Sequence, residues 1–146
     1  MIEIVNNENF AELLLLMHEY QTFYEVANIS SSKNKVFFSK FLGGSEQGVQ
    51  FIYRSNGKAV AFATMYFSFS STIAEQVGVI NDLYTVPSSR GCGFAKELIN
   101  HCKEYAQNKG CYRVQWLTAK SNTSAQAVYD KLNANSSEWV FYALAI

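Results

Sequence analysis

The sequence has no excess of charge of either sign and few charged residues in total. Twelve lysines and arginines balance twelve aspartates and glutamates, and charged residues make up 16% of the 146 positions. A surface that binds nucleic acid generally needs a basic excess, so this balance argues against a general nucleic-acid interface. It leaves room for a local basic groove that binds one phosphorylated cofactor.

Cysteines and long apolar runs are scarce as well. The three cysteines, Cys92, Cys102 and Cys111, form neither a CxxC pair nor an even set for a disulfide framework, which indicates reduced thiols. No apolar stretch approaches the roughly 20 residues that span a membrane, and the N-terminus lacks the pattern of a secretory signal. We therefore expect a cytoplasmic protein without a membrane partner.

Apolar residues, in contrast, make up 49% of the chain, and its length suits one domain, residues 1–146, with a buried core. Hydrophobic periodicity predicts an α/β (α+β) protein whose first half is largely antiparallel. The expected strands cover residues 1–5, 49–54, 58–69, 74–86, 112–118 and 138–145, and helices are expected from residue 9, over 33–42, after the loop at 90–93 and from residue 121 or 122.

Two local signals mark boundaries in the first half of the chain. Asn56-Gly57 lies between two alternating runs and predicts a tight β-hairpin turn. Asn9 is followed three positions later by Glu12, which is close to a capping box at the start of the first helix.

Aromatic residues gather where the first helix should end, beside a carboxylate. Tyr20, Phe23 and Tyr24 precede Glu25. Exposed aromatic rings next to a carboxylate favour a pocket for a cation. Packing in the core or in a loop explains the same residues at least as well, so both interpretations stay open.

A glycine-bearing loop between a strand and a helix is the most informative stretch. The strand ends at Pro87, the loop contains Gly91 and Gly93, and an amphipathic helix follows. Backbone N–H groups at such a helix N-terminus favour an anion. The loop lacks the GxxxxGK[ST] pattern of a Walker phosphate loop, and Lys96 replaces the third glycine of a dinucleotide fingerprint. A structural turn that binds nothing remains the alternative for two glycines alone.

Two motifs then resemble those of the GNAT superfamily of acetyl-CoA-dependent N-acetyltransferases. The run Arg90-Gly91-Cys92-Gly93-Phe94-Ala95 matches its pattern [Arg/Gln]-x-x-Gly-x-[Gly/Ala]. Downstream, Asn122, Ala125, Tyr129 and Lys131 match its second signature, Asn-x-x-Ala-x-x-x-Tyr-x-Lys-x-Gly, except that Asn133 replaces the final glycine. Asparagine tolerates the left-handed conformation that a helix end often needs, so this departure is mild.

The resemblance implies a fold and an activity. The implied fold is GNAT-like, with a mixed, mostly antiparallel sheet of about six to seven strands, about four flanking helices and a splayed acetyl-CoA site. The implied reaction is direct acetyl transfer from acetyl-CoA to a primary amine, such as a small amine or polyamine. Asn81 to Tyr84 and Trp116-x-Thr118 resemble the diamine, polyamine and histone-type branch. A protein or peptide amine is the alternative acceptor, and a non-catalytic acyl-CoA-binding module is the alternative class.

The resemblance also implies roles for particular residues. Tyr129 would be the general acid, since a phenol is protonated at neutral pH and can protonate a thiolate. Asp82 would act as a base or as an anionic clamp for a cationic acceptor, or is a structural carboxylate at a strand end. The pyrophosphate would lie on the loop and the pantetheine arm along the strand before it, with cofactor contacts from Leu83, Tyr84, Thr85, Val86, Arg90, Gly91, Cys92, Gly93, Phe94, Ala95, Lys96, Asn122, Ala125 and Tyr129.

The acceptor site and the assembly are implied less directly. Candidate acceptor-binding residues are Tyr20, Tyr24, Glu25, Asp82 and Trp116. No metal is implied. By analogy with the family, the aromatic stretch Trp139–Tyr142 would pair across the subunits of a homodimer.

Overall fold

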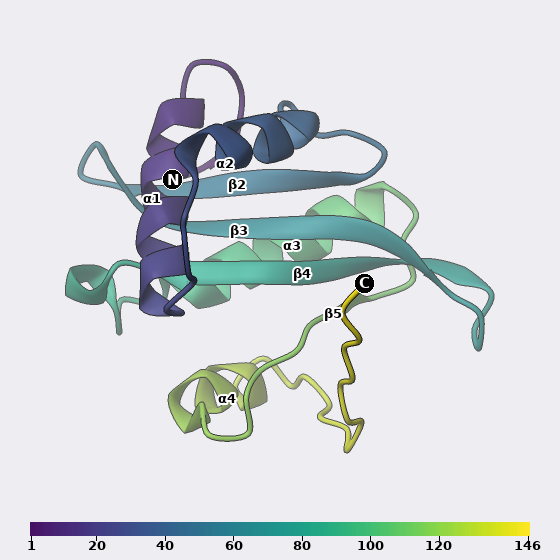
Figure 1. The fold of residues 1–146 in the computed structure, drawn as a ribbon. Helices are drawn as coiled ribbons and strands as arrows, with labels where there is room; N and C mark the ends of the chain where they lie inside the picture. The colour runs from purple at the N-terminus through teal and green to yellow at the C-terminus, as the bar shows by residue number, and fades with distance from the viewer.

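A five-stranded sheet forms the centre of the computed structural model, which describes residues 1–146 (Figure 1). The strands lie in the order β1-β2-β3-β4-β5, and every neighbouring pair is antiparallel except β4 and β5, which are parallel. Their bounds are Ile2–Ile4 (β1), Gly48–Ser55 (β2), Lys58–Ser70 (β3), Glu75–Thr85 (β4) and Val114–Gln115 (β5).

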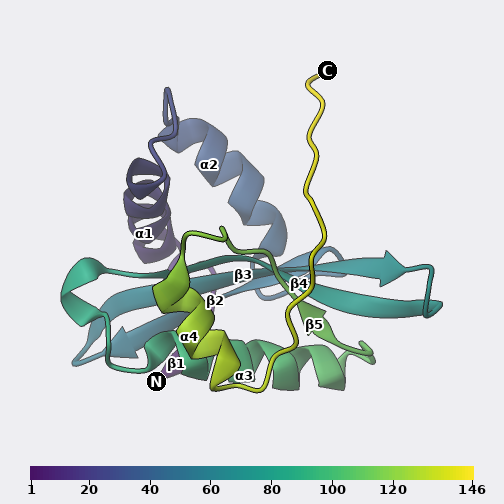
Figure 2. The same cartoon turned by 90° about the horizontal axis from the view of Figure 1, so that it is seen from below.

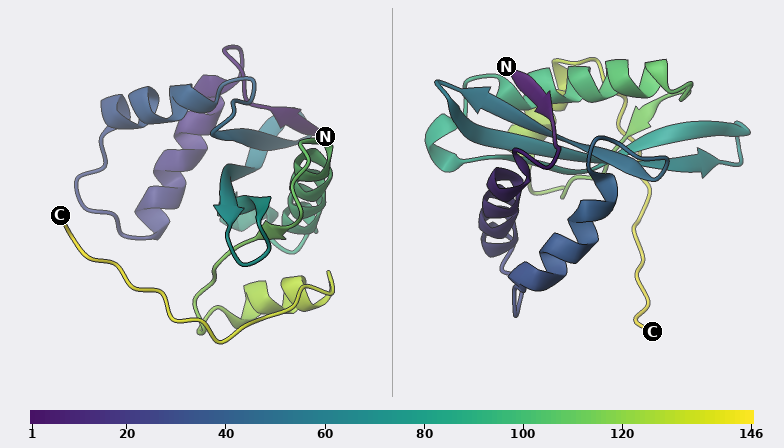
Figure 3. Two further views of the ribbon diagram at one scale, coloured as in Figure 1. Left: turned by 90° about the vertical axis from the view of Figure 1, so that its right-hand side faces the viewer. Right: turned by 90° about the horizontal axis from the view of Figure 1, so that it is seen from above.

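Helices cover both faces of this sheet. Helices α1 (Phe10–Phe23) and α2 (Ser31–Phe38) lie on one face, and α3 (Phe94–Asn108) lies on the other (Figures 2 and 3). Helix α4 (Thr123–Asp130) follows the chain that leaves the sheet after β5, and 3₁₀ turns form at Ser39–Phe41 and Pro87–Ser89. None of the helices is both long and apolar enough to cross a lipid bilayer.

The core consists of two layers, one on each side of the sheet. Ala61, Ala63 and Met65 of β3 pack toward Leu98 and neighbouring residues of α3. Phe62, the intervening residue, packs with Leu13 and Met17 of α1. Because successive side chains of a strand point to opposite faces, a strand covered on both sides reads as a nearly continuous apolar run.

Two predictions about turns are confirmed. Asn56 and Gly57 both have positive φ angles, 49° and 78°, as the tight turn between β2 and β3 requires. Asn133 has φ 57°, so it adopts the left-handed conformation after α4 that its position in the motif suggested.

The expected C-terminal strands are mostly wrong. Residues 138–145 form no strand, and Trp139 and Tyr142 are 88% and 87% exposed. The strand expected over 112–118 is only Val114–Gln115, which pairs with Gly78 and Val79. The sheet therefore has five strands rather than six or seven. The reason is that strand propensity needs a partner edge, and β5 is too short to supply one.

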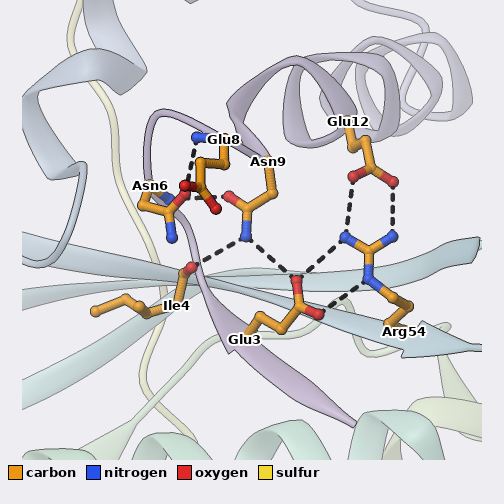
Figure 4. Close-up of a pocket in the computed structure, with 7 residues that line it drawn as sticks. All are labelled: Glu3, Ile4, Asn6, Glu8, Asn9, Glu12 and Arg54. Atoms are coloured by element: carbon orange, nitrogen blue, oxygen red, sulfur yellow. Dashed lines mark hydrogen bonds and ion pairs between the residues drawn. The ribbon is translucent and has the colours of Figure 1, made fainter. Parts of the chain in front are cut away.

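The capping box predicted at the start of α1 is also wrong, although Asn9 is the residue that precedes the helix. Its side chain makes no cap: Oδ1 accepts from the Asn6 N–H at 2.9 Å, and Nδ2 donates to the Ile4 carbonyl at 3.1 Å. Arg54 binds Glu12 and Glu3, each through two hydrogen bonds of 2.9–3.1 Å (Figure 4). The Glu12 carboxylate that a capping box would need is thus bound by Arg54, which links β1 and β2 to α1.

Candidate active site

One edge of β4 is open along its second half. After Gly78 and Val79 the chain of β5 separates from β4 and runs toward α4 (Figure 1). On the other edge, the Val86 N–H donates to the Val60 carbonyl at 2.9 Å. Because such bonds alternate along an antiparallel pair, the backbone groups of Leu83 and Thr85 point toward the open edge. An extended ligand can therefore pair with β4 at Leu83.

The glycine loop presents a set of free backbone donors beside this edge. Gly91 and Gly93 have φ angles of 79° and 86°, and Gly93 precedes α3 without a side-chain cap. No protein acceptor receives the N–H groups of residues 91–96. A Cβ built on either glycine would meet nothing within 4 Å, so the space over the loop is open. Converging free N–H groups at a helix N-terminus suit a phosphate, so the loop fits the pyrophosphate of coenzyme A.

The side chains of the loop differ in orientation and in exposure to solvent. Arg90 folds back toward the strand: its Nε donates to the Thr85 carbonyl at 3.1 Å, and its guanidinium lies 5.0 Å from the Phe23 ring centroid and 5.9 Å from that of Tyr84. Cys92 and Lys96 are exposed. The charge of Arg90 therefore lies at the open edge of β4, on the side of α1.

Asp82 lies on the α1 side of β4, among aromatic rings. It is 7% exposed, and burial raises its pKa, while hydrogen bonds from Thr64, Tyr20 and Asn81 oppose that rise. The Asn81 amide donates to Asp82 Oδ1 at 3.0 Å. Burial, together with the Asp82 charge, raises the pKa of Tyr66 to about 12. The carboxylate is thus solvated by hydroxyl and amide groups and by no cationic side chain.

Tyr20 and Tyr24 form an aromatic wall beside this carboxylate. Their ring centroids are 4.9 Å apart, and the ring of Tyr20 lies 5.9 Å from that of Tyr84. Burial and the Asp82 charge raise the pKa of Tyr20. Glu25, predicted with them, adopts a left-handed conformation after the helix, and its side chain makes no hydrogen bond or ion pair. The structure therefore brings Tyr20, Tyr24 and Asp82 together and leaves Glu25 apart.

Tyr129 and Trp116 face one another where the chain crosses from β5 to α4. Their ring centroids are 5.2 Å apart in an edge-to-face arrangement. Burial raises the pKa of Tyr129; a hydrogen bond with Thr118 opposes the rise, and the nearby Tyr24 adds to it. Tyr129 is thus a protonated phenol at neutral pH, close enough to Tyr24 for that residue to affect its pKa.

Asn122 and Ala125 form the N-terminal cap of α4. Asn122 Oδ1 accepts from the Ala125 N–H at 3.3 Å and so caps the helix. Helix α4 has no fully buried residue. This cap therefore fixes where the helix that carries Tyr129 begins.

Sequence reasoning missed two residues of the site, Thr64 and Gln50. Both are completely buried, and they lie in one row with Asp82, since Gln50 pairs with Thr64 and Thr64 with Asp82 across the strands. Gln50 Nε2 donates to Thr64 Oγ1 at 3.1 Å, whereas Gln50 Oε1 has no partner, which typically costs about 1–3 kcal/mol. A polar residue inside each of two apolar runs was the signal available in the sequence.

Comparisons with known proteins agree with this geometry. A family model described as the acetyltransferase (GNAT) family matches residues 13–134. The uncharacterized N-acetyltransferase YhfO of Bacillus subtilis is 28% identical over 121 residues, which cover 83% of this chain and 80% of that protein. The thialysine N-epsilon-acetyltransferase of Caenorhabditis elegans is 25% identical over 136 residues, covering 90% and 81%.

A solved structure supports the same assignment. The crystal structure of a probable acetyltransferase superposes with a TM-score of 0.86 at 25% identity, covering 100% of this chain and 97% of that one. No group of three metal-ligating side chains is present in the structure.

The family model covers most of the chain, and the relatives and the solved structure agree with it. The chain therefore belongs to the acetyltransferase (GNAT) family and is an acetyl-CoA-dependent N-acetyltransferase.

Proposed function

We propose that the acceptor is a small primary amine or polyamine, in keeping with the diamine and polyamine branch that residues 81–84 resemble. The observation that carries this proposal is the buried carboxylate of Asp82 among aromatic rings, beside the open edge of β4. A compact cation fits such a setting, because aromatic faces and a carboxylate both attract an ammonium group. The thialysine acetyltransferase relative carries a small amine in its name, which supports the same class.

In the proposed complex, the chain binds the cofactor through its backbone. The free N–H groups of residues 91–96 hold the pyrophosphate, and Leu83 pairs with the pantetheine arm. The cofactor supplies an activated acetyl thioester. An N–H group on the open edge near Leu83 stabilises the oxyanion that develops during transfer, an effect typically worth about 2.7–4 kcal/mol per donor.

Two side chains would accept and donate the protons of the acetyl transfer. Asp82 binds the ammonium form of the acceptor and removes one proton, directly or through water, so that the amine nitrogen carries a free electron pair. Tyr129 donates its phenolic proton to the departing thiolate sulfur. The carbon–nitrogen bond forms as the carbon–sulfur bond breaks, and the nitrogen then releases its second proton, which restores the phenol of Tyr129 through water. The products are an N-acetylated amine and free coenzyme A, and Asp82 passes the first proton to solvent.

The proposed function also includes a homodimer and a cytoplasmic location for the whole chain as one domain. The segment from Trp139 to Ile146 is rich in β-branched and aromatic residues, and its large apolar side chains are exposed. Monomeric proteins rarely expose a contiguous apolar segment of this kind. A second copy of this chain is the occupant that fits, since the same apolar segment is exposed in each copy. The three free thiols suit a reducing compartment.

The experiment is a thiol-release assay with acetyl-CoA and a panel of acceptors. The panel holds short diamines, polyamines, amino acids with side-chain amines, amino sugars and lysine-containing peptides. We expect thiol release with at least one small amine and weaker release with peptides. Transfer to peptides alone would contradict the acceptor class. Tight binding of coenzyme A in calorimetry without transfer to any acceptor would contradict the catalytic proposal altogether.

A further inference from the structure

The row Gln50–Thr64–Asp82 crosses three neighbouring strands on the face covered by α1. Cross-strand pairing places Thr64 between the other two. Thr64 and Asp82 lie opposite one another on the same face, close enough for the Thr64 hydroxyl to lower the pKa of the Asp82 carboxyl. An ionised carboxylate can only accept hydrogen bonds, so the Thr64 O–H group is the donor toward it. The Thr64 oxygen is then free to accept, and Gln50 Nε2 donates to it at 3.1 Å. Gln50 thus donates to Thr64, and the Thr64 hydroxyl lies opposite the carboxylate of Asp82, the acceptor at the end of the row.

Gln50 gains little for the fold from this arrangement. Its amide oxygen is buried without any partner, and a buried polar atom in that state destabilises the protein. An apolar side chain of similar length would avoid this penalty among neighbours such as Ile52 and Phe62. The only hydrogen bond of the side chain is the one that orients Thr64. The effect of Gln50 is therefore to orient the Thr64 hydroxyl.

We propose that Gln50 is a positioning residue for acetyl transfer: through its hydrogen bond it holds the Thr64 hydroxyl toward the carboxylate of Asp82. This inference rests on the proposed role of Asp82 at the acceptor amine. Hydrogen bonds strengthen one another along such a chain, and a bond donated to a carboxylate stabilises its ionised form. Gln50 thus helps to keep Asp82 ionised although it is buried.

No other group around Asp82 replaces Gln50 and Thr64 in stabilising the ionised carboxylate. The titratable groups that face it are Tyr20 from α1 and Tyr66 from β3, and burial raises the pKa of both. Both are therefore neutral in the range where a carboxylate and an amine exchange protons. Asn81 of β4 donates to the same carboxylate at 3.0 Å and is independent of Gln50. Lys, Arg and His side chains form no ion pair with Asp82.

Three variants test the inference. Gln50→Met removes the amide at similar length, Thr64→Val removes the hydroxyl at similar volume, and Thr64→Ser restores it. We expect the first two to move the titration of the Asp82 carboxyl, followed by carbon-13 NMR in the free protein, to higher pH. On the acidic side of the pH profile, kcat/KM falls about tenfold and recovers at alkaline pH, whereas Thr64→Ser behaves like the wild type. The exposed Gln47→Met is the matched control.

Two further measurements separate positioning from a purely structural role. Gln50→Met is expected to leave the melting temperature unchanged or raised, since it removes an unpartnered buried oxygen. The double variant Gln50→Met/Thr64→Val is expected to match Thr64→Val alone, because Gln50 acts through Thr64. An unmoved Asp82 titration in Gln50→Met, or additive effects in the double variant, would overturn the inference. If the wild type transfers no acetyl group to any amine, the proposed function fails, while the titration still decides the role of Gln50.

Discussion

Asp82 lies directly opposite Thr64 on the neighbouring strand, and both side chains are buried on the face covered by α1. We expect Asp82→Asn to lower kcat/KM by about 10²-fold, since it removes the carboxylate that accepts the proton of the amine. Asparagine preserves the shape, so coenzyme A binding in calorimetry should not change. Undiminished turnover in this variant would rule out a proton-accepting role.

The same substitution makes a separate prediction about stability. Burial raises the folded-state pKa of Asp82 above the unfolded value, so the stability that this group contributes is present below the unfolded pKa and is lost as pH rises through the folded pKa. Asp82→Asn should therefore raise the melting temperature at neutral pH, by roughly 2–4 °C for each kcal/mol in a domain of this size. The gain should vanish in acid, where the wild-type carboxyl is protonated; a gain that persists there would contradict the cause.

Tyr129 gives a prediction that separates chemistry from binding. Tyr129→Phe should reduce kcat by ten- to hundredfold, because the thiolate loses its proton donor, while the affinity for coenzyme A is retained. The measurement is steady-state kinetics beside calorimetry. Tyr112→Phe, which changes a mostly exposed tyrosine, is the control and should behave like the wild type. Equal kcat in both variants would remove Tyr129 from its role.

The glycine loop can be tested against a matched position elsewhere. Gly93 and Gly110 have φ angles of 86° and 80°, and a Cβ at either would meet nothing within 4 Å. Alanine at either position should cost about 1–2 kcal/mol of stability through backbone strain. Only Gly93→Ala should also weaken coenzyme A binding, by about tenfold or more, because its Cβ would stand where the phosphates approach. Similar losses of affinity in both variants would indicate a general effect of strain.

Arg54 predicts how stability depends on pH. Its hydrogen bonds hold the pKa values of Glu3 and Glu12 below their usual range. A lowered carboxyl pKa contributes stability above the unfolded value, and this contribution is lost as pH falls through the folded one. Arg54→Met should therefore cost about 1 kcal/mol at neutral pH and less in acid, as followed by denaturant unfolding.

The control for Arg54 is an ion pair at the surface. Lys120 and Glu138 lie 3.3 Å apart with side chains 86% and 92% exposed, so Lys120→Met should change stability little. A penalty for Arg54→Met that grows in acid would contradict the sign derived from Glu3 and Glu12.

The exposed C-terminal segment predicts the oligomeric state. Sedimentation should give a dimer for the full chain and a monomer for Phe141→Asp, because a charge cannot be buried in an apolar interface without a partner. Phe69→Asp alters an equally exposed ring at the far end of β3 and should leave the dimer intact. A monomeric wild-type chain would refute the homodimer.

Local patterns predicted much of this molecule because they depend on neighbouring residues. The Asn56-Gly57 turn, the glycines before α3 and the left-handed Asn133 follow from backbone preferences that act over a few positions. The failures involve contacts between distant segments. Asn9 and Glu12 have the spacing of a capping box, yet Arg54 of β2 binds the carboxylate instead.

The sequence by itself determined the cofactor half of the proposed site. The loop at 90–96 and the helix start at Asn122 are continuous stretches, so their conformations and their family signature can be read without knowing the fold. The tertiary structure alone decided which buried polar residues surround Asp82 in the proposed acceptor half. Gln50, Thr64 and Asp82 become neighbours only through the register of three strands, and a shift of one residue would turn each side chain to the opposite face. Pairing across strands is a property of the assembled sheet, and no run of adjacent residues encodes it.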